Sequence, residues 1–165
     1  MTVLSDSDLM AENFEHDLVT PFLLQQLQPA SYDLRLSQIA LMDGDDLPLP
    51  YILEPFGFIL GSTFEVINVP IHMAAKFEGK SSLGRSGIMT HVSAGFIDPG
   101  FQGALTLEIF NASDRPFELR QNMRIGQIMF QYLHNPCSRP YSEIGHYQNQ
   151  YGPTVANPES FYGSY

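Results

Sequence analysis

The sequence lacks the features that mark secreted and membrane proteins. It has a single cysteine, Cys137, so the chain cannot form an internal disulfide. It contains no apolar run of the roughly 18 residues that a membrane-spanning helix needs. Its first ten residues, MTVLSDSDLM, show neither the basic stretch nor the apolar core of a signal peptide. We therefore expect a protein of the reducing cytoplasm, or of the host cytoplasm if the sequence is viral, without a membrane partner.

Basic residues are scarce as well. The chain has 8 Lys and Arg against 18 Asp and Glu, which gives a formal net charge of −10. Nucleic-acid binders present a basic stripe that displaces counterions, so this balance argues against a nucleic-acid partner. The few cations are nevertheless grouped, three within 76–85 and three within 115–124. Such groups favour a small anionic ligand, and ordinary solvated surface charge is the alternative.

The motifs of catalytic zinc are also missing. Zinc-dependent base deaminases use an H-x-E motif together with P-C-x-x-C, and this chain has one cysteine and no H-x-E. The five histidines are scattered, and no two of them have the sequence spacing of a metal-binding pair. No zinc is therefore expected, and the chemistry is left to carboxylates and hydroxyls.

The sequence does contain the pattern of a β protein. Thirteen glycines and twelve prolines indicate many turns. Between the turns, short apolar runs recur at 32–36, 56–60, 64–69, 87–92, 104–110 and 125–133. This spacing is typical of an all-β sandwich or barrel, and the length suits one domain. Ser5 and Asp8, placed just before Leu9, predict a short capped helix near the N-terminus.

Two carboxylates are candidates for chemistry. In the run 104–110, Glu108 shares a strand face with Thr106 and Phe110, so we expect it to be partly buried and suited to acid–base work. Asp98 begins the turn FIDPGF, where it would orient water or a sugar hydroxyl. The alternatives are a surface glutamate and a turn-forming aspartate.

The loop EGKSSLGRSG (78–87) is a candidate anion-binding segment. It contains three glycines, three serines and two cations within ten residues. Its spacing matches neither the P-loop nor the dinucleotide-binding fingerprint, so another kind of site is indicated.

The long segment GKSSLGRSGIMTHVSAGFIDPGFQGALTLEIFN (79–111) resembles, almost position by position, the core of the dCTP deaminases. These enzymes share a superfamily with the trimeric dUTPases. The similarity extends to LSDSDL (4–9), QPASYDLRL (28–36), MRIGQIMF (123–130) and YQNQYGPT (147–154). The resemblance implies a homotrimer of distorted jelly-roll β-barrels with a short N-terminal helix and active sites shared between subunits. Residues 1–140 would form the barrel and 141–165 a C-terminal lid over the active site.

The resemblance also implies residue roles. Ser81 and the backbone of Ala94 would position a water for attack at C4 of cytosine, and Glu108 would carry its proton to the departing ammonia. Arg85 would orient Glu108, and Asp98 would contact the 3′-hydroxyl of the sugar. The phosphate-contacting or lid positions would be Lys80, Ser82, Gln127, Tyr141, His146, Tyr147 and Gln150. Mg²⁺ would arrive on the triphosphate without a protein ligand.

Two branches of the family differ in the motif that begins at Ala94. Deaminase-only enzymes typically read A-H-x-I-D-P-G-W, and enzymes that also remove pyrophosphate from dUTP read A-G-[FW]-I-D-x-G-F. This chain reads AGFIDPGF (94–101), which implies a bifunctional enzyme that converts dCTP to dUMP. A pyrophosphohydrolase acting on dUTP or dCTP without deamination is one alternative. A non-catalytic nucleotide-binding regulator is another, supported by Lys80, His146 and Tyr151, which depart from the family's residues at a phosphate-binding rim.

The last 25 residues differ in character from the rest. They hold five of the eight tyrosines and no lysine or arginine. Such a segment either docks on the protein, where its aromatic rings are buried, or is disordered.

Overall fold

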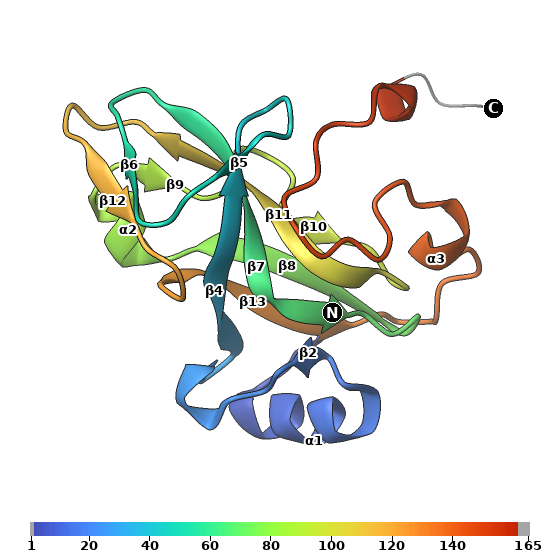
Figure 1. The fold of residues 1–165 in the computed structure, drawn as a ribbon. Coiled ribbons are helices and arrows are strands. Elements are labelled where there is room, and N and C mark those ends of the chain that lie inside the picture. The colour runs from blue at the N-terminus through green and yellow to red at the C-terminus, as the bar shows by residue number, and fades with distance from the viewer. Residues whose placement is uncertain (1, 162–165) are drawn as a thin grey trace.

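Eleven strands join into one curled antiparallel sheet, shown by a computed structural model that describes residues 2–161 (Figure 1). The main path of this sheet has the order β10-β8-β13-β4-β7-β11-β9, and four short strands pair beside it. Its members are β1 (Thr2–Val3), β2 (Val19–Thr20), β3 (Leu27–Gln28), β4 (Ser31–Ala40), β5 (Asp46–Leu47), β7 (Phe58–Asn68), β8 (Met73–Gly79), β9 (Ile88–Met89), β10 (Phe96–Ile97), β11 (Gln102–Asn111) and β13 (Arg124–Tyr132). A separate ribbon joins β6 (Tyr51–Leu53) and β12 (Phe117–Leu119).

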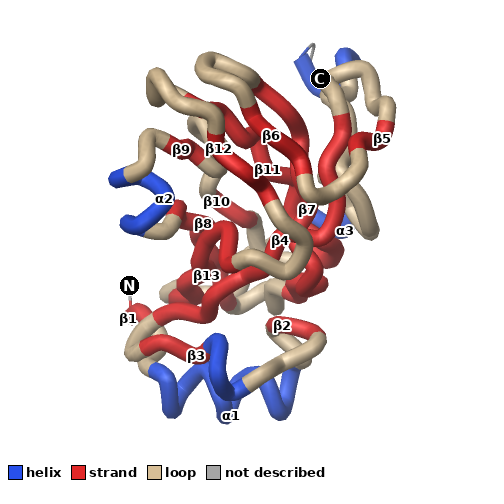
Figure 2. Tube along the Cα trace, turned by 60° about the vertical axis from the view of Figure 1, so that its left-hand side comes forward, coloured by secondary structure: helices blue, strands red, loops and turns tan. Residues whose placement is uncertain are grey.

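Helices lie at the margins of the sheet. They are α1 (Asp6–His16), α2 (Ser81–Arg85), α3 (Tyr141–Ile144) and two 3-10 helices, η1 (Leu24–Gln26) and η2 (Pro158–Phe161). The helix α1 covers one end of the sheet, and α2 and α3 lie on opposite sides of it in both views (Figures 1 and 2). Within residues 2–161, no helix is long and apolar enough to cross a membrane. The predicted mainly β, jelly-roll type of fold with an N-terminal helix is confirmed.

The helix α1 begins where the sequence predicts it. Ser5 and Asp8 form a reciprocal capping box, in which the Ser5 N–H donates to Asp8 Oδ2 (2.9 Å) and the Asp8 N–H donates to Ser5 Oγ (3.3 Å). The Ser5 hydroxyl also donates to Asp8 Oδ2 (2.7 Å), and this bond, followed by the one from the Ser5 N–H, lowers the pKa of Asp8. The helix ends at Asp17, whose left-handed backbone (φ 51°) returns the chain toward β2. Leu9 is the buried residue that fixes this helix to the core.

Several strands differ from the sequence-based expectation. The runs 56–60 and 64–69 are parts of one long strand, β7, and the run 87–92 forms only the short strand β9. Strand β8 was not predicted at all. It lies between β13 and β10, and Met73, Ala74 and Ala75 are all buried. A stretch covered on both faces lacks the alternation of apolar and polar residues that marks a half-exposed strand, and in β8 this alternation begins only at the exposed Lys76 and the buried Phe77.

An irregularity in β7 sets the register of the neighbouring strand β11. Ala104 lies opposite Val66 and Thr106 lies opposite Ser62, so β7 carries extra residues between these pairs. The buried Thr63 hydroxyl closes this bulge, because it donates to the Glu65 carbonyl (2.8 Å) and accepts from the Leu105 N–H (2.9 Å). The register of β11 therefore depends on one side-chain oxygen.

Thr63→Val is expected to lower the free energy of unfolding by about 1–3 kcal/mol, because the Leu105 N–H loses its acceptor in the protein interior. Thr63→Ser retains the oxygen and serves as the control, with a clearly smaller loss. Urea denaturation of both variants at one protein concentration measures the difference. Equal stability of Thr63→Val and the parent protein would show that the hydroxyl does not hold the bulge.

Candidate active site

A cavity of about 550 Å³ lies beside β11 and is walled by β7, β8, β10, α3 and the C-terminal tail (residues 141–161). Its size is in the range of small-molecule sites in proteins. Half of the site residues predicted from the sequence line it. This cavity set consists of Ala94, Asp98, Glu108, Tyr141, Tyr147 and Gln150.

Glu108 reaches the cavity from the exposed face of β11. Leu107 and Ile109 on either side of it are buried in the core, whereas Thr106 and Glu108 are only half-buried. The predicted alternation of this strand is therefore confirmed. The carboxylate is held in place by the main chain, because its Oε2 accepts a hydrogen bond from the Val92 N–H at 3.1 Å. No described residue donates to the second oxygen, so it is available to a water or a ligand.

Asp98 enters the cavity from a tight turn at the end of β10. The Phe101 N–H donates to the Asp98 carbonyl at 3.2 Å, and Gly100 has a φ of +87°. Pro99 and Gly100 are the residues expected at the two central positions of a type II turn. The Gly100 N–H also donates to the Val69 carbonyl at 2.7 Å, which fixes the turn to the end of β7. The carboxylate thus stands on a rigid corner of the backbone.

Tyr141 connects this turn to the tail. Its N–H donates to the Pro99 carbonyl at 2.7 Å, and its phenol oxygen accepts from the Tyr147 N–H at 3.1 Å. Burial raises the pKa of the Tyr141 hydroxyl, and the charge of Asp98 adds to the rise. The phenol is therefore protonated at neutral pH and retains a proton to donate into the cavity.

The tail docks along the free edge of β11. The Asn149 N–H donates to the Gln102 carbonyl at 2.7 Å, and the Ala104 N–H donates to the Gln150 carbonyl at 2.8 Å. The Thr106 hydroxyl accepts from the Thr154 N–H at 3.1 Å. Of the two alternatives for this segment, docking holds for residues 141–161. Tyr162 and Tyr165 lie outside the described residues.

The other predicted site residues lie away from the cavity. This second set consists of Lys80, Ser81, Ser82, Arg85 and Gln127. Ser81, Ser82 and Arg85 are exposed on α2, on the side of the sheet opposite α3 (Figure 1). His146 is exposed on the tail and does not line the cavity. One copy of the chain therefore does not bring the two sets together.

Lys80 is tied to a buried carboxylate. Its Nζ lies 2.5 Å from Asp33 Oδ1, and Arg124 Nη1 lies 3.3 Å from Asp33 Oδ2. Asp33 has no solvent exposure, and Gln28 Nε2 donates to it at 3.4 Å. Gln127 is next to Asp33 across the β4–β13 pairing. This network orders the second set at the start of α2, and the role of Asp33 was not predicted from the sequence.

Electrostatically, the cavity is unusual for an anion site. Its described lining contains no lysine and no arginine, and its ionisable groups are His91, Asp98, Glu108 and two tyrosines. The tail residues that cover it contribute no cation either. By itself the cavity suits an uncharged, hydrogen-bonding and partly apolar group.

The sequence-based prediction did not include His91, because the histidines were considered only as metal ligands. Its ring packs edge-on against Phe77, with centroids 5.5 Å apart, and both residues line the cavity. Its Nδ1 is buried and has no hydrogen-bond partner among the described residues. The sequence signal was its place three residues before Ala94, inside the most family-specific segment.

Gly95 allows the loop with Ala94 to approach β8 closely. The Phe77 N–H donates to the Gly95 carbonyl at 2.7 Å, and a Cβ on Gly95 would lie 2.6 Å from the Phe77 carbonyl oxygen. The same Cβ would lie 3.0 Å from the His91 ring. A side chain at this position therefore requires a backbone shift at the wall of the cavity.

Gly95→Ala is expected to destabilise the protein by about 1–3 kcal/mol, because the added methyl meets main-chain atoms. Gly84→Ala is the matched control, since a Cβ there meets nothing within 4 Å and α2 would gain about 0.5–1 kcal/mol in helix propensity. Thermal unfolding of the two variants measures the contrast. Equal melting temperatures would contradict the close approach at Gly95.

Comparison with known proteins places this site in a family. A sequence profile described as dCTP deaminase-like matches residues 3–133. A "dCTP deaminase, dUMP-forming" of Bifidobacterium longum (strain DJO10A) is 41% identical over 186 residues, covering 97% of this chain and 96% of that protein. A protein of the same name from Clavibacter michiganensis subsp. michiganensis is 40% identical over 179 residues, covering 93% of this chain and 89% of that protein.

Solved structures agree with this result. The 2′-deoxycytidine 5′-triphosphate deaminase of Agrobacterium tumefaciens matches with a TM-score of 0.67 and 27% identity, over 80% of this chain and about half (48%) of that chain. The EIAV dUTPase matches with a TM-score of 0.53 and 18% identity, over 78% of this chain and 93% of that chain, which shows a shared fold. The profile match and the identity with the bacterial relatives confirm the resemblance: the chain belongs to the dCTP deaminase-like family.

Proposed function

We propose that the protein deaminates dCTP at C4 and releases pyrophosphate, so that dUMP is formed. The observation that carries the proposal is the Glu108 carboxylate, which is fixed by the Val92 N–H at the wall of a nucleoside-sized cavity. Relatives at 40–41% identity are named for the same dUMP-forming reaction. Two waters are consumed: dCTP and water give dUTP and ammonia, and dUTP and water give dUMP and pyrophosphate.

In the deamination step, Glu108 acts as the proton carrier. Its oxygen Oε2 is engaged by the main chain, so Oε1 accepts the proton of a water aimed at C4. The same carboxyl then delivers this proton to the amino group, which leaves as ammonia. A positioned acid–base group of this kind contributes about 10²–10⁴ in rate. The Ala94 backbone, which lines the same cavity, helps to hold the water.

The triphosphate requires cations that the cavity of one chain does not have. Lys80, Ser81, Ser82 and Arg85 supply cations and hydroxyls, but they lie outside the cavity. We therefore propose a homotrimer in which α2 of one copy reaches the cavity of the next. In this arrangement Ser81 positions the water, Arg85 orients Glu108, and Lys80, Ser82 and Gln127 face the phosphates.

Asp98 and the tail act on the sugar and phosphate side. Asp98 lies at the cavity on the Pro99-Gly100 turn. Its carboxylate accepts a hydrogen bond from the 3′-hydroxyl of the sugar, and it activates the second water for attack at the α-phosphate. Tyr141, Tyr147 and Gln150 extend from the tail over the same space and act as its lid. His146 would join them at the phosphates only if the tail turns further inward, because its side chain is exposed.

Magnesium is proposed to enter with the nucleotide. The cavity offers two carboxylates, Asp98 and Glu108, and each has a role toward the sugar or the water. Mg²⁺ is commonly held by phosphate oxygens, waters and at most one or two carboxylates. This preference fits an ion that is carried by the triphosphate itself. When bound, Mg²⁺ neutralises part of the triphosphate charge.

The cytoplasmic location of the protein also stays a prediction.

The test is to incubate pure protein with dCTP or dUTP and Mg²⁺ and to separate the products by chromatography. Glu108→Gln keeps the shape and hydrogen-bonding capacity of the side chain but removes the base, so ammonia release should fall at least about 10²-fold. Asp98→Asn should impair pyrophosphate release from dUTP while the nucleotide still binds. Nucleotide affinity of both variants, measured separately, excludes loss of binding as the cause.

Each other product pattern identifies an alternative. Release of dCMP from dCTP, or of dUMP from dUTP by a protein that releases no ammonia from dCTP, would identify a pyrophosphohydrolase. Nucleotide binding without turnover would identify a regulator. Accumulation of dUTP from dCTP would show deamination alone. Ammonia release near the parent rate by Glu108→Gln would remove Glu108 from the mechanism.

A further inference from the structure

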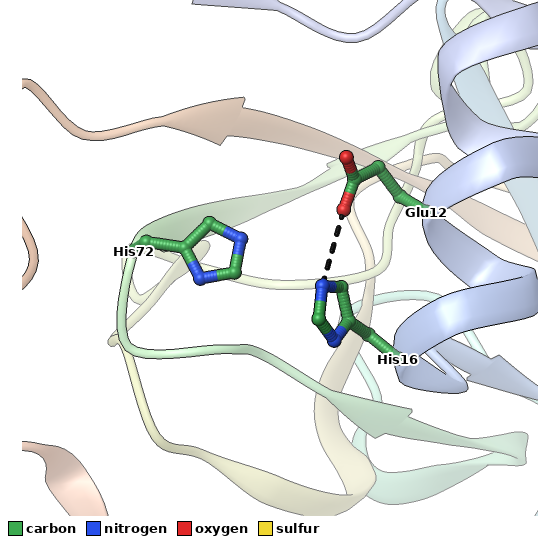
Figure 3. A group of neighbouring side chains, drawn as sticks. All are labelled: Glu12, His16 and His72. Atoms are coloured by element: carbon green, nitrogen blue, oxygen red, sulfur yellow. Dashed lines mark ion pairs between the residues drawn. The ribbon is translucent and has the colours of Figure 1, made fainter.

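Outside the cavity, the end of α1 and the loop between β7 and β8 bring Glu12, His16 and His72 together (Figure 3). One ligand atom of each lies within 4.8 Å of the others, and all three side chains are half-buried. Among residues 2–161 this is the one group of three or more His, Cys, Asp or Glu residues with such a geometry. None of its members lines the cavity.

The spacing of the donor atoms is close to that of a metal centre. Glu12 and His16 are four residues apart on α1 and so share one helix face. Glu12 Oε2 lies 3.5 Å from His16 Nε2, and two ligands of a tetrahedral zinc ion, each bonded at about 2.0–2.1 Å, are roughly 3.3 Å apart. The rings of His16 and His72 have centroids 5.3 Å apart. A ligand atom of His72 lies within 4.8 Å of those of Glu12 and His16, so binding one ion would require this side chain to move closer.

A buried carboxylate oxygen points into this group. Glu12 Oε2 is buried and makes no hydrogen bond among the described residues, although buried carboxylate oxygens normally make one. Its polar neighbour is His16 Nε2 at 3.5 Å. The other oxygen, Oε1, accepts a short hydrogen bond from the Tyr132 hydroxyl. Metal-binding carboxylates are commonly oriented by such a partner. An ordinary Glu–His pair on a helix surface would explain neither the buried oxygen nor the approach of His72.

The backbone under both histidines is fixed. The His16 carbonyl accepts from Asn68 Nδ2 at 2.7 Å, and the His72 carbonyl accepts from the Leu133 N–H at 2.9 Å. These bonds connect the end of α1 to β7 and the loop to β13. The donors are therefore presented by a rigid scaffold rather than by flexible termini.

The surroundings are negatively charged, which favours a cation. Three carboxylates of α1, those of Asp8, Glu12 and Glu15, lie near the Tyr132 hydroxyl. Apart from His16, no described lysine, arginine or histidine forms an ion pair with these carboxylates. A bound divalent ion would balance this charge.

We propose that Glu12, His16 and His72 bind one divalent transition-metal ion, Zn²⁺ by preference, which links α1 to the β7–β8 loop. Two imidazoles and one carboxylate suit zinc, cobalt or nickel better than magnesium, which prefers oxygen ligands. A water completes the tetrahedron. The site is structural and independent of the nucleotide.

The experiment uses the full chain, freed of metal by a chelator and dialysed, without nucleotide. Titration with ZnCl₂ by calorimetry is expected to show one ion per chain and a raised melting temperature, and CoCl₂ should give the visible absorption of a tetrahedral centre. Affinity should fall at least about 10-fold in His72→Ala. The matched control is His134→Ala, an exposed histidine after β13 that is outside the group. If His72→Ala is unfolded, His72→Gln replaces it.

Three results would overturn the proposal. One is the absence of stoichiometric zinc binding in the parent protein. Another is zinc binding of equal affinity in the parent, His16→Ala and His72→Ala variants, which would place the ion elsewhere. Displacement of zinc by millimolar MgCl₂ would likewise contradict a site with two imidazole ligands.

Discussion

The main-chain hydrogen bonds along β11 are the interaction on which the site depends. On one edge β11 pairs with β7, and near its start its other edge accepts the tail through Gln102 and Ala104. Its buried face anchors the strand in the core, so the opposite face presents Thr106 and Glu108 to the cavity in a fixed orientation. The floor and part of the cover of the cavity are thus assembled by one strand, and the Thr63 bulge determines which of its residues face inward.

Charge is the second constraint. A pyrimidine nucleoside triphosphate combines a partly apolar base with a strongly anionic triphosphate group. The cavity of one chain suits only the base. The cations and hydroxyls that suit the triphosphate are ordered by the buried Asp33 at the start of α2, on the other side of the sheet (Figure 2). An overall acidic chain thereby keeps these cations apart from Glu108, the proposed proton carrier. Assembly of several copies is the proposed way in which the two parts meet.

Local features of the sequence predicted local structure well. Ser5 and Asp8 marked the start of α1, and the alternation around Glu108 gave the correct face of β11, because both depend on neighbouring residues alone. Features that depend on distant contacts were missed. Strand β8 is buried on both faces over residues 73–75, and its alternation of apolar and polar residues begins only at Lys76. The network around Asp33 and the group of Glu12 with His72 exist only because the sheet brings remote segments together.

The family resemblance added what local patterns did not contain, namely which residues act together. Six of the residues that it indicated for the site line one cavity: Ala94, Asp98, Glu108, Tyr141, Tyr147 and Gln150. It did not indicate His91, whose buried Nδ1 faces the same region, nor that Gly95 is required by the approach of its loop to β8. His91 and Gly95 belong to the site because the fold brings their loop against β8.

The claim that the active site is shared between copies is tested most directly by mixing two inactive variants. Glu108→Gln damages the cavity and Arg85→Ala damages the second set, and the two chains are unfolded together, reassembled in equal amounts and assayed for ammonia release from dCTP. If each site combines α2 of one copy with the cavity of the next, random assembly gives about one intact site in four, and activity returns to about a quarter of the parent value. If the mixture stays as inactive as the separate variants, while the parent protein recovers after the same treatment, each chain carries its own complete site and the account is contradicted.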